Sequence, residues 1–120
     1  MFDLKVKDHI ASAHQLRGYD GPCSVLHGHT WKVEVIVSGE ALNDIGLLVD
    51  FKILKKKLKE VLMPLDHVNL NEHPAFQEIN PSTENLARYI YAQLKTHVAP
   101  LKLNTVEVFE SDTASIVYYE

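Results

Sequence analysis

The sequence predicts an α+β fold in which a four-stranded antiparallel sheet carries two helices on one face. Two segments near the N-terminus and two near the C-terminus alternate apolar and polar residues, which is typical of strands with one buried face. Between them, apolar residues recur at helical spacing in two further segments. Strands and helices segregated along the chain in the order β-β-α-α-β-β indicate this class of fold.

The first strand follows directly from the N-terminus. Its apolar residues stand at even positions, and its odd positions are mostly charged. The residues of this apolar phase are Phe2, Leu4, Val6, Ile10, Ser12 and His14. A bulge near Asp8, the one charged residue in that phase, would shift the pattern by one position. In a regular strand, His14 shares the buried face with Leu4.

The second strand is expected from about His27 to Val37. Residues 18–22 precede it and contain two glycines and a proline, which predicts a loop. The residues that share one face of this strand are His27, His29, Trp31, Val33, Val35 and Val37. Lys32 and Glu34 take the opposite face. Residues 39–46 then form a connection.

Two helices follow, with recognisable starts and stops. Asp50 stands where a helix cap or first-turn acid is favoured, and Pro64 ends the first helix. Ser82 is expected to cap the second helix, with Asn85 as an imperfect substitute for the capping-box Glu or Gln, and Pro100 ends that run. The apolar positions are Phe51, Leu54, Leu58, Val61 and Leu62, then Leu86, Ile90, Leu94 and Val98.

The last two strands are expected at Thr105 to Glu110 and Ser115 to Tyr119. The short polar loop between them, residues 111–114, fits a hairpin. Helices on one face of the sheet leave the other face and the edges to be covered. Oligomerisation is a natural way to cover them.

Composition indicates a single globular domain, residues 1–120, whose 120 residues are enough to bury a core. A net charge of −4 argues against a nucleic-acid partner. No apolar run approaches the ~20 residues that span a bilayer, and the alternating N-terminus lacks the apolar core of a signal peptide. Cys23 is the only cysteine, so no intramolecular disulfide forms. We therefore expect a cytoplasmic protein without a membrane partner.

Three histidines predict a metal site. His27 and His29 lie one pleat apart on one strand face, and His14 stands on a possible neighbouring strand. Zinc takes imidazole nitrogens at roughly 2.0–2.1 Å, and three such ligands with an open fourth position describe a catalytic site. The alternative is unrelated strand histidines that are hydrogen-bonded or solvated. A cupin-like motif that includes Glu34 is rejected, because Glu34 faces away from His29.

Cys23 and the Asp66-His67 pair are candidates for proton transfer. Cys23 follows a proline close in sequence to the predicted cation, and nearby positive charge makes a thiolate available as base or nucleophile. It would otherwise be a buried hydrophobe or a fourth zinc ligand that closes the site. Asp66 and His67 form either a polar turn or a carboxylate-oriented histidine, the usual proton-transfer partner of a cysteine.

Glu110 predicts a ligand contact. It shares the phase of Val106 and Val108, so a regular strand would point its carboxylate inward, where it needs a partner. The partner would be a basic side chain or a ligand such as the amidine-like N–H pair of a pterin or guanine ring. The alternative is a strand-end glutamate that bends out to water.

These motifs, taken in order, match a known family. The chain resembles the 6-pyruvoyl-tetrahydropterin synthase and 6-carboxy-tetrahydropterin synthase family along nearly its whole length. The matching residues are Ala13-His14, Cys23 before His27-Gly28-His29, Gly46 to Val49-Asp50-Phe51, Leu65-Asp66-His67 with Leu70-Asn71, Pro81 with Thr83-Glu84-Asn85-Leu86-Ala87, and Glu110-Ser111.

The resemblance implies a tunnelling (T-) fold, in which sheets from several subunits form a barrel with helices outside and active sites at subunit interfaces. The resemblance implies a homo-oligomer based on trimers, a hexamer first, with a tetramer as the alternative. The implied roles are zinc binding by His14, His27 and His29, proton abstraction by Cys23 with Asp66 and His67 as relay, and pterin binding by Glu110 with Ser82, Thr83 and Glu84.

Three residues separate Cys23 from His27, which looks like the carboxy-forming branch of queuosine biosynthesis. That branch converts 7,8-dihydroneopterin triphosphate and water to 6-carboxy-5,6,7,8-tetrahydropterin, acetaldehyde and triphosphate. The alternatives are the pyruvoyl-forming enzyme, a non-catalytic pterin-binding protein and a structural zinc protein. A third, folate-related branch is disfavoured, because no glutamate lies between Tyr19 and His29. Trp31 and Gln15 depart from the residues usual in the family.

Overall fold

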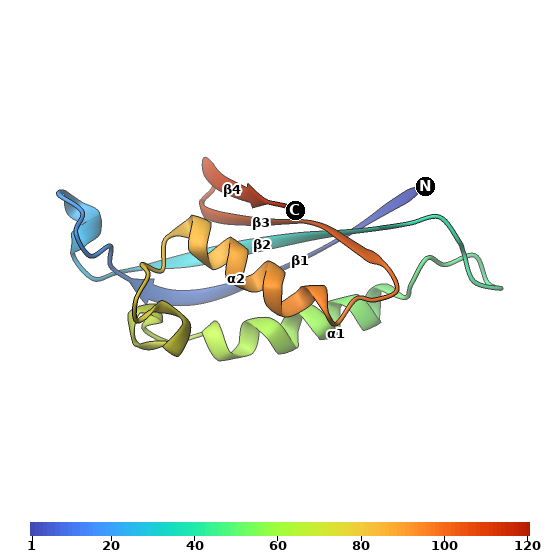
Figure 1. The fold of residues 1–120 in the computed structure, drawn as a ribbon, viewed down its shortest axis with the longest axis horizontal. Helices are drawn as coiled ribbons and strands as arrows, with labels where there is room; N and C mark the ends of the chain where they lie inside the picture. The colour runs from blue at the N-terminus through green and yellow to red at the C-terminus, as the bar shows by residue number, and fades with distance from the viewer.

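Four strands form one antiparallel sheet in the order β1-β2-β3-β4, and two helices cover one of its faces (Figure 1). The structure, a computed structural model, describes all 120 residues. The elements are β1 (Phe2–His14), β2 (His27–Gly39), α1 (Phe51–Leu62), α2 (Thr83–Lys95), β3 (Lys102–Ser111) and β4 (Ala114–Tyr118). The predicted α+β class and the order β-β-α-α-β-β are confirmed. Neither helix is both long and apolar enough to cross a membrane.

The pairing of β1 with β2 is continuous. It runs from Phe2 opposite Gly39 to His14 opposite His27, without a shift in register. The bulge considered near Asp8 is therefore absent, and Asp8 lies opposite Val33. Because the strand stays regular, His14 remains on the face that the helices cover, where it is 2% exposed.

The sequence signals for the helix starts are confirmed. The Asp50 carboxylate accepts a hydrogen bond from the Lys52 N–H at 2.8 Å, and the Ser82 hydroxyl accepts one from the Asn85 N–H at 3.1 Å. The predicted extension of the second helix through Val98 is wrong. After α2 ends, the His97 N–H bonds to the Leu94 carbonyl in a tighter turn. The helix stops early because the chain must turn there to enter β3, and Val98 stays buried.

The hydrophobic core lies between the helices and the sheet. The odd-numbered residues of β2 from Trp31 to Val37 are fully buried, as are Val106 and Val108 of β3. Buried residues at four-residue intervals on the two helices face this layer: Leu54, Leu58 and Leu62 on α1, and Leu86, Ile90 and Leu94 on α2. The predicted apolar phases therefore identify the covered face of the sheet, which is also the face of His14, His27 and His29.

A segment after α1 lies along the outer edge of β1. The His67 N–H bonds to the Ala11 carbonyl at 2.7 Å, and the Ala13 N–H bonds to the Val68 carbonyl at 3.0 Å. The Asp66 carboxylate accepts the Ala11 N–H at 2.8 Å. These bonds satisfy backbone groups of an edge strand that would otherwise stay unpaired. They also hold Asp66 and His67 in place.

Candidate active site

The end of β1, the start of β2, the start of α2 and the β3–β4 turn come together at one end of the molecule (Figure 1). The β1–β2 register places His14 directly opposite His27, with His29 one pleat further on. The ring centroids of these three histidines lie 4.6 to 5.2 Å apart. Antiparallel pairing thus brings together three imidazoles from two strand ends.

Four side chains form a possible metal-binding cluster. One ligand atom from each of His14, His27, His29 and Glu110 lies within 4.8 Å of all the others. The Nε2 atoms of His14 and His29 are buried, and neither makes a hydrogen bond. Buried polar atoms are almost always partnered, so this pair requires an explanation. A metal ion bound by these imidazole nitrogens supplies it, because such donors suit zinc and related transition metals.

Burial also favours the neutral form of two of these histidines. Loss of solvation lowers the pKa of His14 and of His29 below 6.5, although the Pro81 carbonyl and Glu110, respectively, oppose the shift. A neutral imidazole has a lone pair for a metal, whereas a protonated one has none. The site therefore keeps metal-binding nitrogens available at neutral pH.

Protein stripped of metal should become less stable as the pH falls below about 6.5. The unfolded histidines take up protons near that pH and the folded ones only at lower pH, so the unfolded state then binds more protons. Urea unfolding midpoints measured from about pH 8 to about pH 5 test this. A His14→Gln variant should show a weaker pH dependence, whereas His9→Gln, at an exposed strand position, should match wild type. Identical profiles for His14→Gln and wild type would contradict the prediction.

Backbone carbonyls set the tautomers of two histidines. The Nδ1 of His14 lies 2.7 Å from the Pro81 carbonyl, and the Nδ1 of His27 lies 2.7 Å from the Val25 carbonyl. A carbonyl only accepts, so Nδ1 must carry the proton and Nε2 keeps its lone pair. Such outer partners orient metal ligands and raise their basicity. The rings are thus prepared to bind a metal through Nε2.

Arg17 holds the loop that presents the Pro81 carbonyl, a role that sequence reasoning missed. Its guanidinium donates hydrogen bonds to three carbonyls of this loop, those of Phe76, Gln77 and Ile79. Its backbone exchanges hydrogen bonds with the Asn80 side chain at 2.9 Å in each direction. Arg17 lies three residues after His14 in the sequence. The same stretch of chain therefore supplies both the histidine and the side chain that holds the loop against it.

Replacing Arg17 with methionine, which keeps much of the stem and removes the donors, should raise the zinc dissociation constant about tenfold. The loop would no longer hold the Pro81 carbonyl against His14. Competition with a chromophoric chelator measures the constant. Lys32→Met is the matched control, because Lys32 makes only an exposed ion pair with Asp112. Equal zinc affinities for Arg17→Met and Lys32→Met would contradict the prediction.

Glu110 lies between the histidines and the start of α2. Its Oε2 accepts a hydrogen bond from the Thr83 hydroxyl at 2.8 Å, and its Oε1 lies 3.2 Å from the His29 Nε2. The β3–β4 pairing shifts between Phe109 and Ser111, so Glu110 sits at a β-bulge, a feature common beside active sites. A cavity of about 150 Å³ adjoins it, lined by Thr83, Glu84, Glu110, Ala114, Ser115 and Ile116.

The other predicted pterin contacts differ in position. Thr83 is buried and bound to Glu110, whereas Glu84 is exposed at the cavity. Ser82 does not line this cavity, because its hydroxyl caps α2. Its visible role is therefore to start the helix that carries Thr83.

Cys23 lies in a 3₁₀ turn, Pro22–Ser24, between β1 and β2. Its carbonyl accepts the Leu16 N–H at 2.8 Å, which ties the turn to the end of β1. The thiol is partly buried and makes no hydrogen bond. Cys23 is not part of the four-residue cluster, in which Glu110 is the fourth donor.

Asp66 and His67 form a close pair. Adjacent residues seldom face each other, but His67 adopts a left-handed backbone conformation with φ of 55°. Its Nε2 lies 3.7 Å from the second carboxylate oxygen of Asp66, and the imidazole is 80% exposed. Non-glycine residues in this conformation often mark functional sites. The carboxylate thus lies near a solvent-accessible imidazole, at a distance longer than a hydrogen bond.

Cys23 and His67 are not joined by a hydrogen bond within one chain, and none links the Cys23 thiol to Asp66. His67 borders a shallow groove of about 520 Å³, whose lining includes Ala11, Ala13 and Thr30 of the uncovered face and also His29. His14, His27 and Glu110 do not line this groove. Within one chain, His29 is therefore the one member of the cluster that borders the groove of His67.

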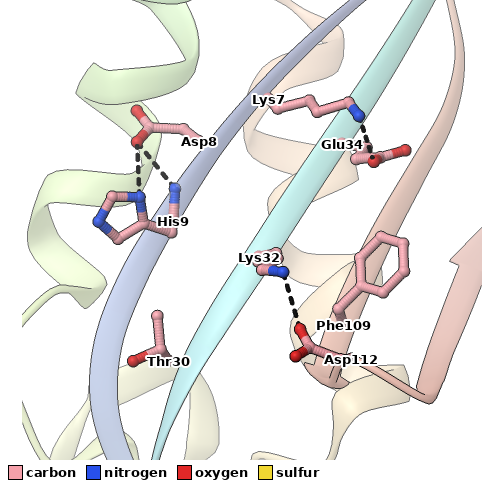
Figure 2. Close-up of a pocket in the computed structure, with 8 residues that line it drawn as sticks. All are labelled: Lys7, Asp8, His9, Thr30, Lys32, Glu34, Phe109 and Asp112. Carbon is pink, nitrogen blue, oxygen red and sulfur yellow. Dashed lines mark hydrogen bonds and ion pairs between the residues drawn. The ribbon is translucent and has the colours of Figure 1, made fainter.

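The largest cavity, about 730 Å³, also lies on the uncovered face, as Figure 2 shows. Its lysines and acids are paired, with Lys7 3.1 Å from Glu34 and Lys32 2.8 Å from Asp112. Glu34 thus points away from the histidines, as its strand phase predicts. This cavity brings together no unpartnered metal-binding atoms.

Comparison with known proteins gives a consistent result. A family model described as 6-pyruvoyl tetrahydropterin synthase matches residues 3–120. A Bacillus subtilis protein named 6-carboxy-5,6,7,8-tetrahydropterin synthase is 37% identical over 98% of this chain and 84% of its own length. A human 6-pyruvoyl tetrahydrobiopterin synthase is 39% identical over 77% of this chain and 65% of its own length. The solved 6-pyruvoyl tetrahydropterin synthase of Caenorhabditis elegans superposes with a TM-score of 0.88, at 25% identity, over 99% of this chain and 95% of its own.

Proposed function

Because the chain belongs to the 6-pyruvoyl tetrahydropterin synthase family, we propose that it is a zinc-dependent lyase of the carboxy-forming branch. It would convert 7,8-dihydroneopterin triphosphate and water to 6-carboxy-5,6,7,8-tetrahydropterin, acetaldehyde and triphosphate, a step of queuosine biosynthesis. The observation that carries the proposal is the cluster of buried, unpartnered imidazoles beside Glu110. Relatives that are 31–37% identical over at least 90% of this chain have the carboxy-forming name, which supports this branch.

The chain's residues fit distinct tasks in such a reaction. His14, His27 and His29 would hold the zinc ion, which as a Lewis acid polarises the substrate's side-chain hydroxyls when bound. Glu110, held by Thr83, would accept two N–H groups of the pterin ring and so orient it. Fixing the ring in this way places the reacting carbons before a base, an effect worth several kcal/mol of the barrier.

Proton transfer would fall to Cys23, Asp66 and His67. The Cys23 thiolate would remove a proton from carbon, and His67, oriented by Asp66, would pass protons onward. Because no hydrogen bond joins His67 to Cys23 within one chain, and His14, His27 and Glu110 do not line the groove of His67, we assign the two halves of a working site to different subunits. A homo-oligomer, trimer-based and most simply a hexamer, would bring them together.

The pyruvoyl-forming reaction is the second candidate. The human relative with that name, 39% identical over 77% of this chain, favours it. The interval of three residues between Cys23 and His27 favours the carboxy-forming reaction instead.

Product analysis decides between the two. Purified, zinc-loaded protein incubated with 7,8-dihydroneopterin triphosphate should release acetaldehyde in step with triphosphate. Triphosphate released with a pyruvoyl pterin and no acetaldehyde would select the second candidate. If neither product forms while the pterin still binds, the protein is a non-catalytic pterin-binding member of the family.

A further inference from the structure

We propose that Glu110 is the fourth ligand of the metal before substrate arrives, and that it leaves the metal when the pterin ring binds. This rests on the proposed function, in which the histidines hold a metal and Glu110 meets the ring. The metal would then have an open position only while a pterin is seated. The Glu110 carboxylate thereby couples pterin binding to the opening of a coordination position on the metal.

The first observation is the separation of donor atoms. The Glu110 Oε1 lies 3.2 Å from the His29 Nε2, yet that nitrogen makes no hydrogen bond. Two ligands of one tetrahedral zinc, each at roughly 2.0–2.1 Å, are about 3.3 Å apart. The two atoms are thus spaced as neighbours on one ion, without the geometry of an imidazole–carboxylate hydrogen bond.

The second observation is how Glu110 is held. Thr83 donates to Oε2, which leaves Oε1 directed toward the cluster. The other residue weighed as a fourth ligand, Cys23, is outside the cluster. The carboxyl-bearing side chain is 35% exposed at the edge of the 150 Å³ cavity, so it has room to move between the cluster and the cavity.

The two roles of this carboxylate compete for the same oxygen, Oε1. A bidentate contact with the N–H pair of a pterin ring uses both oxygens in one plane. In the proposed exchange, the carboxylate turns into the ring plane and Oε1 moves away from the His29 Nε2 and from the metal. Pterin binding therefore opens the metal, and by linkage an exogenous metal ligand should strengthen pterin binding by the same factor.

Azide binding to the cobalt-loaded protein tests this, because azide needs an open metal position and changes the visible spectrum of Co²⁺. Azide should bind the Glu110→Gln variant at least about tenfold more tightly than wild type, since the amide is a poor ligand. Unsubstituted pterin, which lacks side-chain hydroxyls, should raise azide affinity in wild type by a similar factor. It should have no such effect in Glu110→Gln. Glu60→Gln, at an exposed carboxylate on α1 outside both the cluster and the cavity, should behave as wild type.

Equal azide affinities for wild type and Glu110→Gln in the absence of pterin would overturn the proposal. So would pterin binding that leaves the azide affinity of wild type unchanged. Pterin binding is read independently from quenching of pterin fluorescence. A wild-type protein that binds no pterin would contradict the proposed function itself, whereas the azide comparison without pterin would still report whether Glu110 is a ligand.

Discussion

Replacing Cys23 with alanine should lower turnover by a factor of about 10²–10⁴, the usual contribution of a general base. Zinc content and pterin affinity should stay at wild-type levels, because Cys23 lies outside the cluster of His14, His27, His29 and Glu110. Steady-state assays of acetaldehyde, metal analysis of the purified protein and pterin fluorescence measure the three quantities.

The three readings separate the competing roles of Cys23. Loss of stoichiometric zinc from the Cys23→Ala variant would make the cysteine a structural ligand. Full turnover would show that the thiol is only a small, partly buried side chain. Ser24→Ala is a suitable control, because it changes a hydroxyl in the same turn whose only hydrogen bond is to the Gly21 carbonyl. Its activity should match wild type.

Mixing two inactive variants should restore activity. Cys23→Ala and His67→Ala each remove one group of the proposed proton relay, and each should be inactive alone. In hybrid oligomers, a site that takes Cys23 from one subunit and His67 from another would be intact in a fraction of cases. Co-expression with two different affinity tags, followed by tandem purification, yields such hybrids for the acetaldehyde assay.

Hybrids without recovered activity would contradict the assignment of the two residues to different subunits. A second variant ensures that loss of function is not loss of fold. His67→Gly should be as inactive as His67→Ala but similar to wild type in its urea midpoint. Glycine relieves the positive φ of 55° at this position, which offsets the greater freedom it gives the unfolded chain.

The Glu110 exchange and the two-subunit site concern the same problem. A metal ion with an open coordination position can react before the substrate is bound. The proton relay, in contrast, is useful only after the substrate is bound. Closing the metal with Glu110 until the ring is seated would order these events. The Thr83 hydroxyl, which holds the other carboxylate oxygen, is then a positioning group for both states.

Much of the site could be predicted from the sequence, because its members sit on strands with a strict period of two. That period puts His14, His27 and His29 on the covered face and turns Glu110 inward. The Asp50 and Ser82 caps were likewise predictable, since a cap forms with residues only two or three positions away. The end of α2 was not, because the turn into β3 overrides a four-residue repeat.

Only the tertiary structure decided how these residues are supported and joined. The Pro81 carbonyl that orients His14 is 67 residues away, and the Asn80 side chain that pairs with Arg17 is 63 residues away. The spacing of 3.2 Å between Glu110 and His29 depends on the packing of β3 and β2 and on a bulge. The sequence by itself determined which side chains face the site, because that follows from local backbone geometry. Which atoms meet there depends on contacts between distant segments, and these have no local pattern in the chain.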